Sequence, residues 1–211
     1  MAVLDAGFMN VLYLCRHGET DWNAQGRIQG RTDTRLNAAG HAQAERLAHV
    51  LLGERPRASL VVSSPMCRAV ETARHIADLL DVELVCDEDL TELHTGRYTG
   101  CVASELASDP RWQAHLRDPW IEGCGEEGES AVAVRERVMR AVERYRDRHV
   151  VVVSHATPIR HIIMGLLDMP NRHLYHLVVG NASVTRFDRH DAFSKLVYMN
   201  YMDNLFSDKS L

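Results

Sequence analysis

Two hydrophobic patterns alternate along the chain: short continuous apolar runs, and longer stretches in which apolar residues recur every three or four positions. The short runs, rich in Val and Leu, are typical of strands buried in a sheet. They lie at residues 10–15, 59–63, 82–86 and 149–154. The longer stretches are typical of helices that pack one face on a sheet. They lie at residues 38–52, 66–80, 128–147 and 157–167.

This alternation predicts how the elements assemble. A strand followed by a helix and a second strand favours a parallel pair, with the helix covering one face of the sheet. Weaker strand patterns near residues 183–187 and 195–201 complete the series. We therefore expect an α/β fold, a three-layer sandwich with a mostly parallel sheet and helices on both faces.

The residues that flank the helical stretches support these boundaries. Asn37 is the expected N-cap of the first long helix, and Gly53 is expected to end it. Pro65 and Pro158 lie at the starts of two later helices. Proline is tolerated there because the first turn of a helix does not need its N–H.

Residues 96–128 interrupt the pattern. This stretch is rich in Gly and Pro, contains two tryptophans and shows only short helical pieces. A chain of 211 residues suits one domain. We expect residues 1–211 to form a single domain with an insertion at about 96–128 that lies over the active site.

Composition and charge narrow the class of protein. Lys and Arg total 24 against 29 Asp and Glu, and the net charge of -5 disfavours binding to nucleic acid or to an anionic membrane. No apolar run could span a bilayer, and residues 1–9 lack the basic segment of a signal peptide. The five cysteines form no Cys-x-x-Cys pair. We expect a reduced cytoplasmic protein, and the sequence leaves its assembly open, a homodimer included.

Polar side chains follow three of the expected strands at their carboxyl ends. Arg16 and His17 follow the first strand, Arg68 lies on the helix after the second, and His155 follows the fourth. Ligands of open α/β sheets bind at this edge, so these side chains are expected to share a pocket. Guanidinium groups bind oxygens in pairs and keep their charge, so the pocket is predicted to bind a dianionic phosphate.

Five segments of the sequence resemble one known family. They are LCRHGETDWNAQGRIQG, SSPMCRAVETA, the region of Glu92, EEGES and VVVSHATPIR. In this order and at these separations they are similar to the histidine phosphatase superfamily, also called phosphoglycerate mutase-like. The resemblance covers residues 10–201. It implies the fold of that family and an enzyme that passes through a phosphohistidine.

Physical reasoning and the resemblance assign the same roles to the candidate catalytic residues. His17 is the expected nucleophile, because a neutral imidazole can attack phosphorus and divide the transfer into two easier steps. Arg16, Arg68 and His155 are expected to hold the phosphoryl oxygens. The two arginines should also disfavour the imidazolium form of His17. Glu92 is the expected general acid, which protonates the leaving alkoxide and then takes a proton from the attacking water.

Three further residues match substrate-binding positions of the family. Asn23 is expected to donate a hydrogen bond to the phosphate, although capping of a turn would explain the same residue. Gln29 and Gly30 lie in the next turn, where glycine allows the backbone to approach the substrate. Glu129 and Ser130 are interpreted as the start of a helix, outside the site.

Neither a metal nor another cofactor is expected. The arginines supply the positive charge that the transfer needs. His173 and His176 could share a helix face, but no third ligand accompanies them. The sequence also lacks the motifs of serine hydrolases, P-loops, dinucleotide sites and zinc hydrolases.

The region after Glu92 distinguishes the functions that the family allows. Mutases that resemble this chain carry a longer insertion that retains a bisphosphate, whereas about three dozen residues separate Glu92 from Glu129 here. A shorter insertion should admit water to the phosphohistidine. We therefore expect a phosphomonoester hydrolase of the small-phosphatase branch, acting on small phosphorylated metabolites. A cofactor-dependent phosphoglycerate mutase is one alternative, and a non-catalytic regulator that binds a phosphorylated ligand is another.

The identity of the substrate is left open by the sequence. His94, Tyr98 and Ala156 depart from the pattern of the family, the first two where the leaving group should lie. Phosphoserine, a sugar phosphate, a phosphoglycerate and a cobalamin precursor all remain candidates. Possible selectivity residues of the insertion, which surface packing explains equally well, are Arg111, Trp112, Arg117 and Trp120.

Overall fold

The computed structural model describes residues 10–119, 124 and 127–202. Its centre is a six-stranded sheet with the order β3-β2-β4-β1-β5-β6. The strands are β1 (Asn10–Arg16), β2 (Leu60–Ser63), β3 (Leu84–Cys86), β4 (Val150–Ser154), β5 (Val184–Arg189) and β6 (Ser194–Tyr201). All six coincide with strand patterns predicted from the sequence.

The sheet is mostly parallel, as predicted. β3, β2, β4 and β1 pair in parallel, whereas β5 pairs antiparallel with β1 and β6 antiparallel with β5. A short connection suffices between the last two strands because antiparallel neighbours need no crossover. The four parallel strands therefore end at one edge of the sheet, where β1 and β4 deliver Arg16 and Ser154 side by side.

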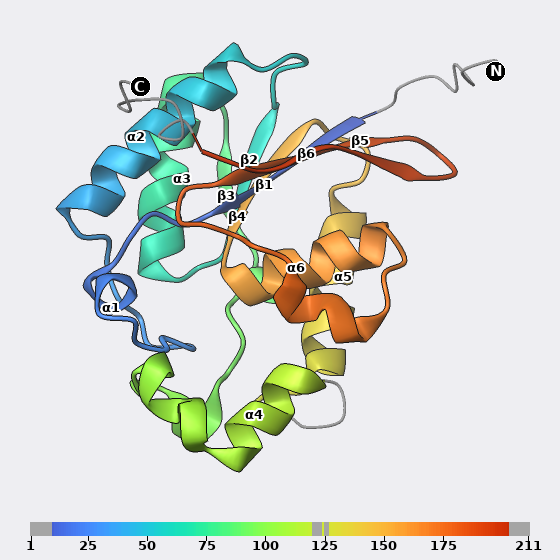
Figure 1. Cartoon of the computed structure of the whole chain (residues 1–211). Coiled ribbons are helices and arrows are strands. Elements are labelled where there is room, and N and C mark those ends of the chain that lie inside the picture. The colour runs from blue at the N-terminus through green and yellow to red at the C-terminus, as the bar shows by residue number, and fades with distance from the viewer. Residues whose placement is uncertain (1–9, 120–123, 125–126, 203–211) are drawn as a thin grey trace, which may run out of the picture.

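Helices cover both faces of the sheet, as Figure 1 shows. The four long helices are α2 (Ala38–Gly53), α3 (Cys67–Leu80), α5 (Ala131–Arg144) and α6 (Ala156–Leu166). Side chains alternate along β1, so that Val11 and Tyr13 pack with α2 and α3, while Leu12 and Leu14 pack with α5 and α6. The predicted three-layer α/β sandwich is confirmed.

Shorter elements lie beyond the carboxyl ends of the parallel strands. They are α1 (Asp21–Ala24), α4 (Pro110–Arg117), η1 (Glu88–Leu90), η2 (Gly96–Tyr98), η3 (Ala103–Ser108) and η4 (Asn171–His176). In Figure 1, α1 and α4 lie on the same lower side of the molecule. In the described part of the chain, no helix is long and apolar enough to cross a membrane.

The ends of several elements differ from prediction. α5 begins at Ala131 rather than 128, because the Ser130 hydroxyl caps it by accepting from the Ala133 N–H, and it ends before the predicted 147. Gly53 lies inside α2, and the chain turns out of the helix at Glu54. The third strand is shorter than predicted. Asp81 ends α3 in a left-handed conformation, so the extended segment begins only at Leu84.

Candidate active site

A cavity of about 210 Å³ opens at the carboxyl edge of the parallel strands. Its wall combines residues of β1, α3 and α6 with residues of the loops beyond the sheet. The lining residues are Arg16, His17, Asn23, Arg27, Ile28, Gln29, Gly30, Arg68, Glu92, Leu93, Thr95, Trp112, His115, Cys124, Thr157, Arg160 and Tyr175. Seven of the eight predicted site residues are in this set, and His155 lies behind it.

His17 is buried directly after β1, and its ring has a defined tautomer. Nδ1 lies 2.7 Å from the carbonyl oxygen of Gly18, which can only accept, so Nδ1 carries the proton and Nε2 keeps its lone pair. Burial lowers the pKa of His17 well below 6.5, and the charges of Arg16 and Arg68 lower it further. Burial is thus the larger cause, where the sequence pointed to the arginines alone. His17 is neutral at physiological pH.

The loop that holds His17 is packed against two helices. Gly18 donates its N–H to Thr72 Oγ1 on α3 at 3.0 Å. A Cβ at Gly18 would lie 2.4 Å from the carbonyl oxygen of Gly40 on α2, so no larger residue fits there. Asn181 donates from Nδ2 to the carbonyl oxygens of His17 and Gly18, each at 3.2 Å. The sequence reasoning did not identify Asn181, whose contacts link distant parts of the chain.

Arg16 presents an unused donor at the cavity. Its Nη1 donates to the Val179 carbonyl at 2.8 Å, whereas its buried Nε has no hydrogen-bond partner among the described residues. Burial lowers the pKa of Arg16 to about 10, and the charge of Glu92 opposes that shift. The side chain therefore stays cationic at neutral pH. A buried donor without a partner is costly, and a bound anion would satisfy it.

Arg68 is fully buried and connects three parts of the site. Its Nη1 and Nη2 donate to the carbonyl oxygens of Thr32 and Gly30 at 2.7 and 2.9 Å, and its Nε donates to His155 Nδ1 at 3.2 Å. His155 Nδ1 must therefore accept, which places the ring proton on Nε2. That nitrogen lies 2.8 Å from Ser64 Oγ. Both ring nitrogens of His155 thus have protein partners, and the ring centroid lies 5.1 Å from that of His17.

Asn23 caps a turn and also faces the cavity. Its Oδ1 accepts from the N–H and hydroxyl of Thr20, at 3.2 and 3.0 Å, and from Asn181 Nδ2 at 3.1 Å. These bonds fix the amide plane and leave Nδ2 as the donor that is not used in them. Capping and ligand binding are therefore compatible in this residue, although the sequence presented them as alternatives.

Gln29 and Gly30 form the next part of the wall. Gln29 Oε1 accepts from the hydroxyls of Thr20 and Thr34, which orients its amide. Gly30 adopts a φ of +49°, and a Cβ there would lie 2.3 Å from Thr95 Oγ1. Only glycine suits a position with both this backbone conformation and so close a neighbour.

Glu92 lines the cavity on a loop that is braced from outside. Arg137, a buried residue of α5, donates from Nη1 to the carbonyl oxygens of Asp89 and Thr91 at 2.8 and 2.6 Å. Its Nη2 donates to the Glu92 carbonyl at 3.3 Å. Its Nε and Nη2 also bind the two carboxylate oxygens of Glu129 at 2.8 and 3.0 Å. Glu129 is therefore outside the cavity, as interpreted, but it belongs to the support of Glu92.

This ion pair also changes the acidity of Glu129. Burial alone would raise the pKa of its carboxyl group, but hydrogen bonding to Arg137 and the charges of Arg137 and Arg31 lower it overall. Glu129 is therefore a carboxylate at neutral pH, and its pairing with Arg137 is a fixed feature of the loop.

Part of the cavity wall is aromatic and carries one cation. Tyr175 hydroxyl and His115 Nε2 lie 2.5 Å apart, and the Trp112 ring lies 5.7 Å from the His115 ring. Arg160 Cζ lies 5.6 Å from the centroid of the Tyr175 ring. Of these four residues the sequence reasoning named only Trp112 as a site candidate. The others lie on segments whose fold, not spacing, brings them to the cavity.

The remaining candidates lie elsewhere. Arg111 and Arg117 are exposed on α4, and Trp120 is outside the described residues. His173 and His176 face each other with their Nδ1 atoms 3.1 Å apart. Nowhere among the described residues do three or more His, Cys, Asp or Glu side chains gather as ligands for a metal ion.

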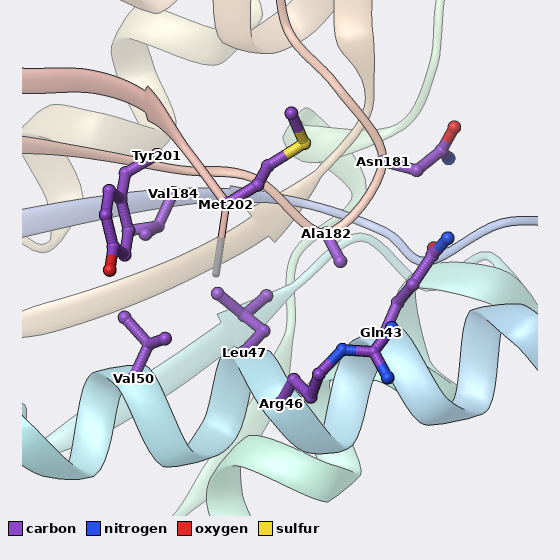
Figure 2. A pocket seen from close by; sticks show the side chains of 9 residues that line it. All are labelled: Gln43, Arg46, Leu47, Val50, Asn181, Ala182, Val184, Tyr201 and Met202. Atoms are coloured by element: carbon purple, nitrogen blue, oxygen red, sulfur yellow. The ribbon is translucent and has the colours of Figure 1, made fainter. Parts of the chain in front are cut away.

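A second hollow of about 70 Å³ is lined by residues of α2 and by residues at the start of β5 and the end of β6. In Figure 2, Leu47 and Val50 rise from α2 toward Val184 and Tyr201, and Arg46 extends beside Gln43. Because this hollow is small and partly apolar and contains none of the predicted site residues, the 210 Å³ cavity is the candidate active site.

Several known proteins are similar to this chain in sequence and structure. A protein of Escherichia coli named probable phosphoglycerate mutase is 32% identical over 182 residues, which cover 84% of each chain. A phosphoserine phosphatase of Entamoeba histolytica, solved with 3-phosphoglyceric acid, superposes with a TM-score of 0.83 at 30% identity, covering 92% of this chain and 98% of that one. A mycobacterial glucosyl-3-phosphoglycerate phosphatase, solved with VO3, gives a TM-score of 0.81 at 30% identity over 90% and 99% of the two chains.

The family model described as histidine phosphatase superfamily (branch 1) matches residues 12–202. That range includes β1 from Leu12 onward, all of β4 and every residue that lines the cavity. The resemblance found in the sequence is confirmed: the chain belongs to the histidine phosphatase superfamily.

Proposed function

We propose that this protein hydrolyses phosphomonoesters of small metabolites through a phosphohistidine at His17, without a metal or another cofactor. One observation carries the proposal. The Nδ1 proton of His17 is held by the Gly18 carbonyl, which leaves a nucleophilic Nε2 in a cavity lined by Arg16 and Arg68. The names of the two similar phosphatases described above support hydrolysis.

The first step transfers the phosphoryl group to the protein. The lone pair of His17 Nε2 attacks phosphorus, and the ester P–O bond breaks with its electron pair going to the alkoxide oxygen. Glu92 gives its proton to that oxygen. Arg16 Nε and the guanidinium of Arg68 stabilise the phosphoryl oxygens. His155 contributes by turning its Nε2 proton from Ser64 to the same oxygens.

The second step releases phosphate. The Glu92 carboxylate takes a proton from water, which attacks phosphorus, and the P–N bond breaks with its electron pair returning to Nε2. Asn23 Nδ2, the Gln29 amide and the backbone at Gly30 orient the phosphoryl group throughout. The arginines supply the positive charge, so the proposed reaction requires no metal ion.

The segment 96–128 is proposed to act as an insertion that covers the site. Trp112, His115 and Cys124, which all lie in it, line the cavity. The cavity volume of about 210 Å³ is below that of pockets for drug-sized ligands, which favours small metabolites.

Steady release of inorganic phosphate from p-nitrophenyl phosphate in excess EDTA tests the proposal. Binding of one equivalent of ligand without phosphate release would instead indicate a regulator. The relative named probable phosphoglycerate mutase makes mutase activity the second candidate. Rapid formation of 2-phosphoglycerate from 3-phosphoglycerate with catalytic 2,3-bisphosphoglycerate would favour it over hydrolysis.

A further inference from the structure

Arg160 is a cation of the cavity that the proposed chemistry does not use. It lies on α6, its Nε donates to the Leu177 carbonyl at 2.9 Å, and its guanidinium lies over the Tyr175 ring. These two contacts fix the plane of the group. Neither Nη1 nor Nη2 has a hydrogen-bond or ion-pair partner among the described residues. Both nitrogens are therefore available to a ligand.

Two other arginines that are largely withdrawn from solvent differ in this respect. Arg137 is paired with Glu129, and Arg186 with Glu54 and Asp188, in each case at 2.8 to 2.9 Å. Removing a guanidinium from water without a partner costs several kcal/mol, which is why buried cations are normally paired. A partner for Arg160 is thus expected to come from outside the chain.

The aromatic neighbours of Arg160 do not supply a negative charge. Burial raises the pKa of Tyr175 above the ordinary range, so its hydroxyl stays protonated at neutral pH. That hydroxyl is also engaged with His115 Nε2 at 2.5 Å. Tyr175 therefore gives Arg160 no negative charge to pair with.

The positive charge of the residues that line the cavity exceeds the negative charge of one bound phosphate group. Four arginines and the single carboxylate of Glu92 line it. A phosphomonoester dianion, with Glu92 protonated as the proposed first step requires, leaves two positive charges without a counterpart. A monoanion on the leaving group would offset one of them. A carboxylate matches the paired Nη donors of a guanidinium, which bind two oxygens at once.

We infer that Arg160 binds a carboxylate on the leaving group, so that the enzyme prefers small phosphate esters that also carry a carboxylate. This inference rests on the proposed hydrolysis at His17 and adds the class of substrate. Arg160 is a specificity-determining residue in this account. It contacts the part of the ester that leaves and not the phosphoryl group.

A matched pair of esters tests this inference. 3-Phosphoglycerate and glycerol 3-phosphate share the primary phosphate ester and the neighbouring hydroxyl, and they differ in a carboxylate against a neutral hydroxymethyl group. We expect kcat/KM of the wild type to favour 3-phosphoglycerate at least tenfold. Arg160→Gln should reduce that ratio to near one, and Arg160→Lys should restore part of it. Arg172→Gln, which removes an exposed arginine of η4 outside the cavity, should leave the ratio as in the wild type.

Two results would overturn the inference: a wild-type ratio near one, or an unchanged ratio in Arg160→Gln, which an equal loss for both esters would also give. The first needs no variant, so the test holds even where Arg160→Gln does not fold. Binding measurements distinguish a failure of the proposed hydrolysis from a failure of this inference. The Kd values of both esters for His17→Ala, which lacks the nucleophile, report on Arg160 without turnover. If the wild type released no phosphate and His17→Ala still preferred 3-phosphoglycerate, the proposed function would fail and the carboxylate site would stand.

Discussion

The imidazole Nδ1 of His17 lies 2.7 Å from the carbonyl oxygen of Gly18, the next residue in the chain. This contact selects the tautomer, because a carbonyl oxygen can only accept. It also holds the ring beside Arg16 and Arg68, whose charges together with burial keep the ring neutral. A single local turn thus prepares the nitrogen that the proposed mechanism requires.

The depressed pKa values of His17 and His155 predict how stability depends on pH. Burial is the largest cause of both shifts, and both rings are neutral in the folded protein well below pH 6.5. The unfolded chain takes up these protons near its ordinary pKa of about 6.5, so stability is complete above that pH and falls as the pH drops below it. Each group contributes about 1.4 kcal/mol per pH unit in this window.

Urea unfolding without ligand at about pH 7.5 and about pH 5.5 measures this effect. We expect the free energy of unfolding to fall by about 3 kcal/mol from these two residues. The variant His17→Gln should reduce that fall by the share of one residue, about 1.4 kcal/mol, whereas His41→Gln, at an exposed position, should keep it. Equal free energies at the two pH values would contradict the neutral buried histidines.

Glu92→Gln should slow alkyl phosphates far more than p-nitrophenyl phosphate. An alkoxide needs a proton to leave, whereas p-nitrophenolate leaves without one, so we expect a loss of about 10²- to 10⁴-fold in kcat/KM, which reports the first transfer and not the shared release of phosphate, for the alkyl ester alone. Glu88→Gln, at an exposed position of the adjacent η1, is the matched control and should retain activity on both. Equal losses on both esters in Glu92→Gln would remove the residue from the acid role.

Replacing Arg137, which supports the loop that carries Glu92, should change both the stability of the protein and its preference between substrates. Arg137→Met leaves Glu129 Oε1 and three backbone carbonyls without the donors that Arg137 supplies, and breaking such a buried pair costs about 3 to 5 kcal/mol. The folded fraction should also lose alkyl phosphatase activity more than p-nitrophenyl phosphatase activity, because the acid is displaced. Thermal unfolding and the ratio of the two rates test this. A stability loss with an unchanged ratio would show that the brace does not position Glu92.

Gly30→Ala should disrupt the wall of the cavity through a steric contact. The new Cβ would lie 2.3 Å from Thr95 Oγ1, so Thr95 or the backbone that carries Gln29 must shift. Gly26→Ala is the matched control: its φ of +66° is also left-handed, but the added Cβ would meet nothing within 4 Å. Backbone strain of about 1 to 2 kcal/mol should affect both, whereas we expect a fall in kcat/KM of at least tenfold in Gly30→Ala only. Similar kinetics for the two variants would exclude the contact with Thr95.

Much of the fold and most of the site could be predicted from the sequence. The hydrophobic periodicity of each element, and the residues that follow each strand, are visible within a short stretch of chain. Arg16 and His17 follow directly from the end of β1, and Arg68 from the first turn of α3. Helix ends were less predictable, since a side chain such as Ser130 decides where α5 begins. The start of the third strand was likewise not predictable, because Asp81 adopts a left-handed conformation and the strand begins only at Leu84.

Residues brought to the cavity by tertiary packing could not be predicted. Arg160 was part of a recognised motif, yet only the structure shows that it lines the cavity beside Tyr175. Asn181 and Arg137 act through contacts with segments far away in the chain. No local pattern marks such residues, because their position depends on how the helices and loops pack on the sheet.

Chemical trapping of the intermediate tests the central claim most directly. Wild-type protein is mixed with radiolabelled p-nitrophenyl phosphate in EDTA, quenched in alkali and digested, because phosphohistidine survives alkali but not acid. We expect label on the peptide that contains His17 and no label in His17→Ala. Label on another residue, undiminished labelling of His17→Ala, or phosphate release by His17→Ala at the wild-type rate would contradict a phosphohistidine at position 17.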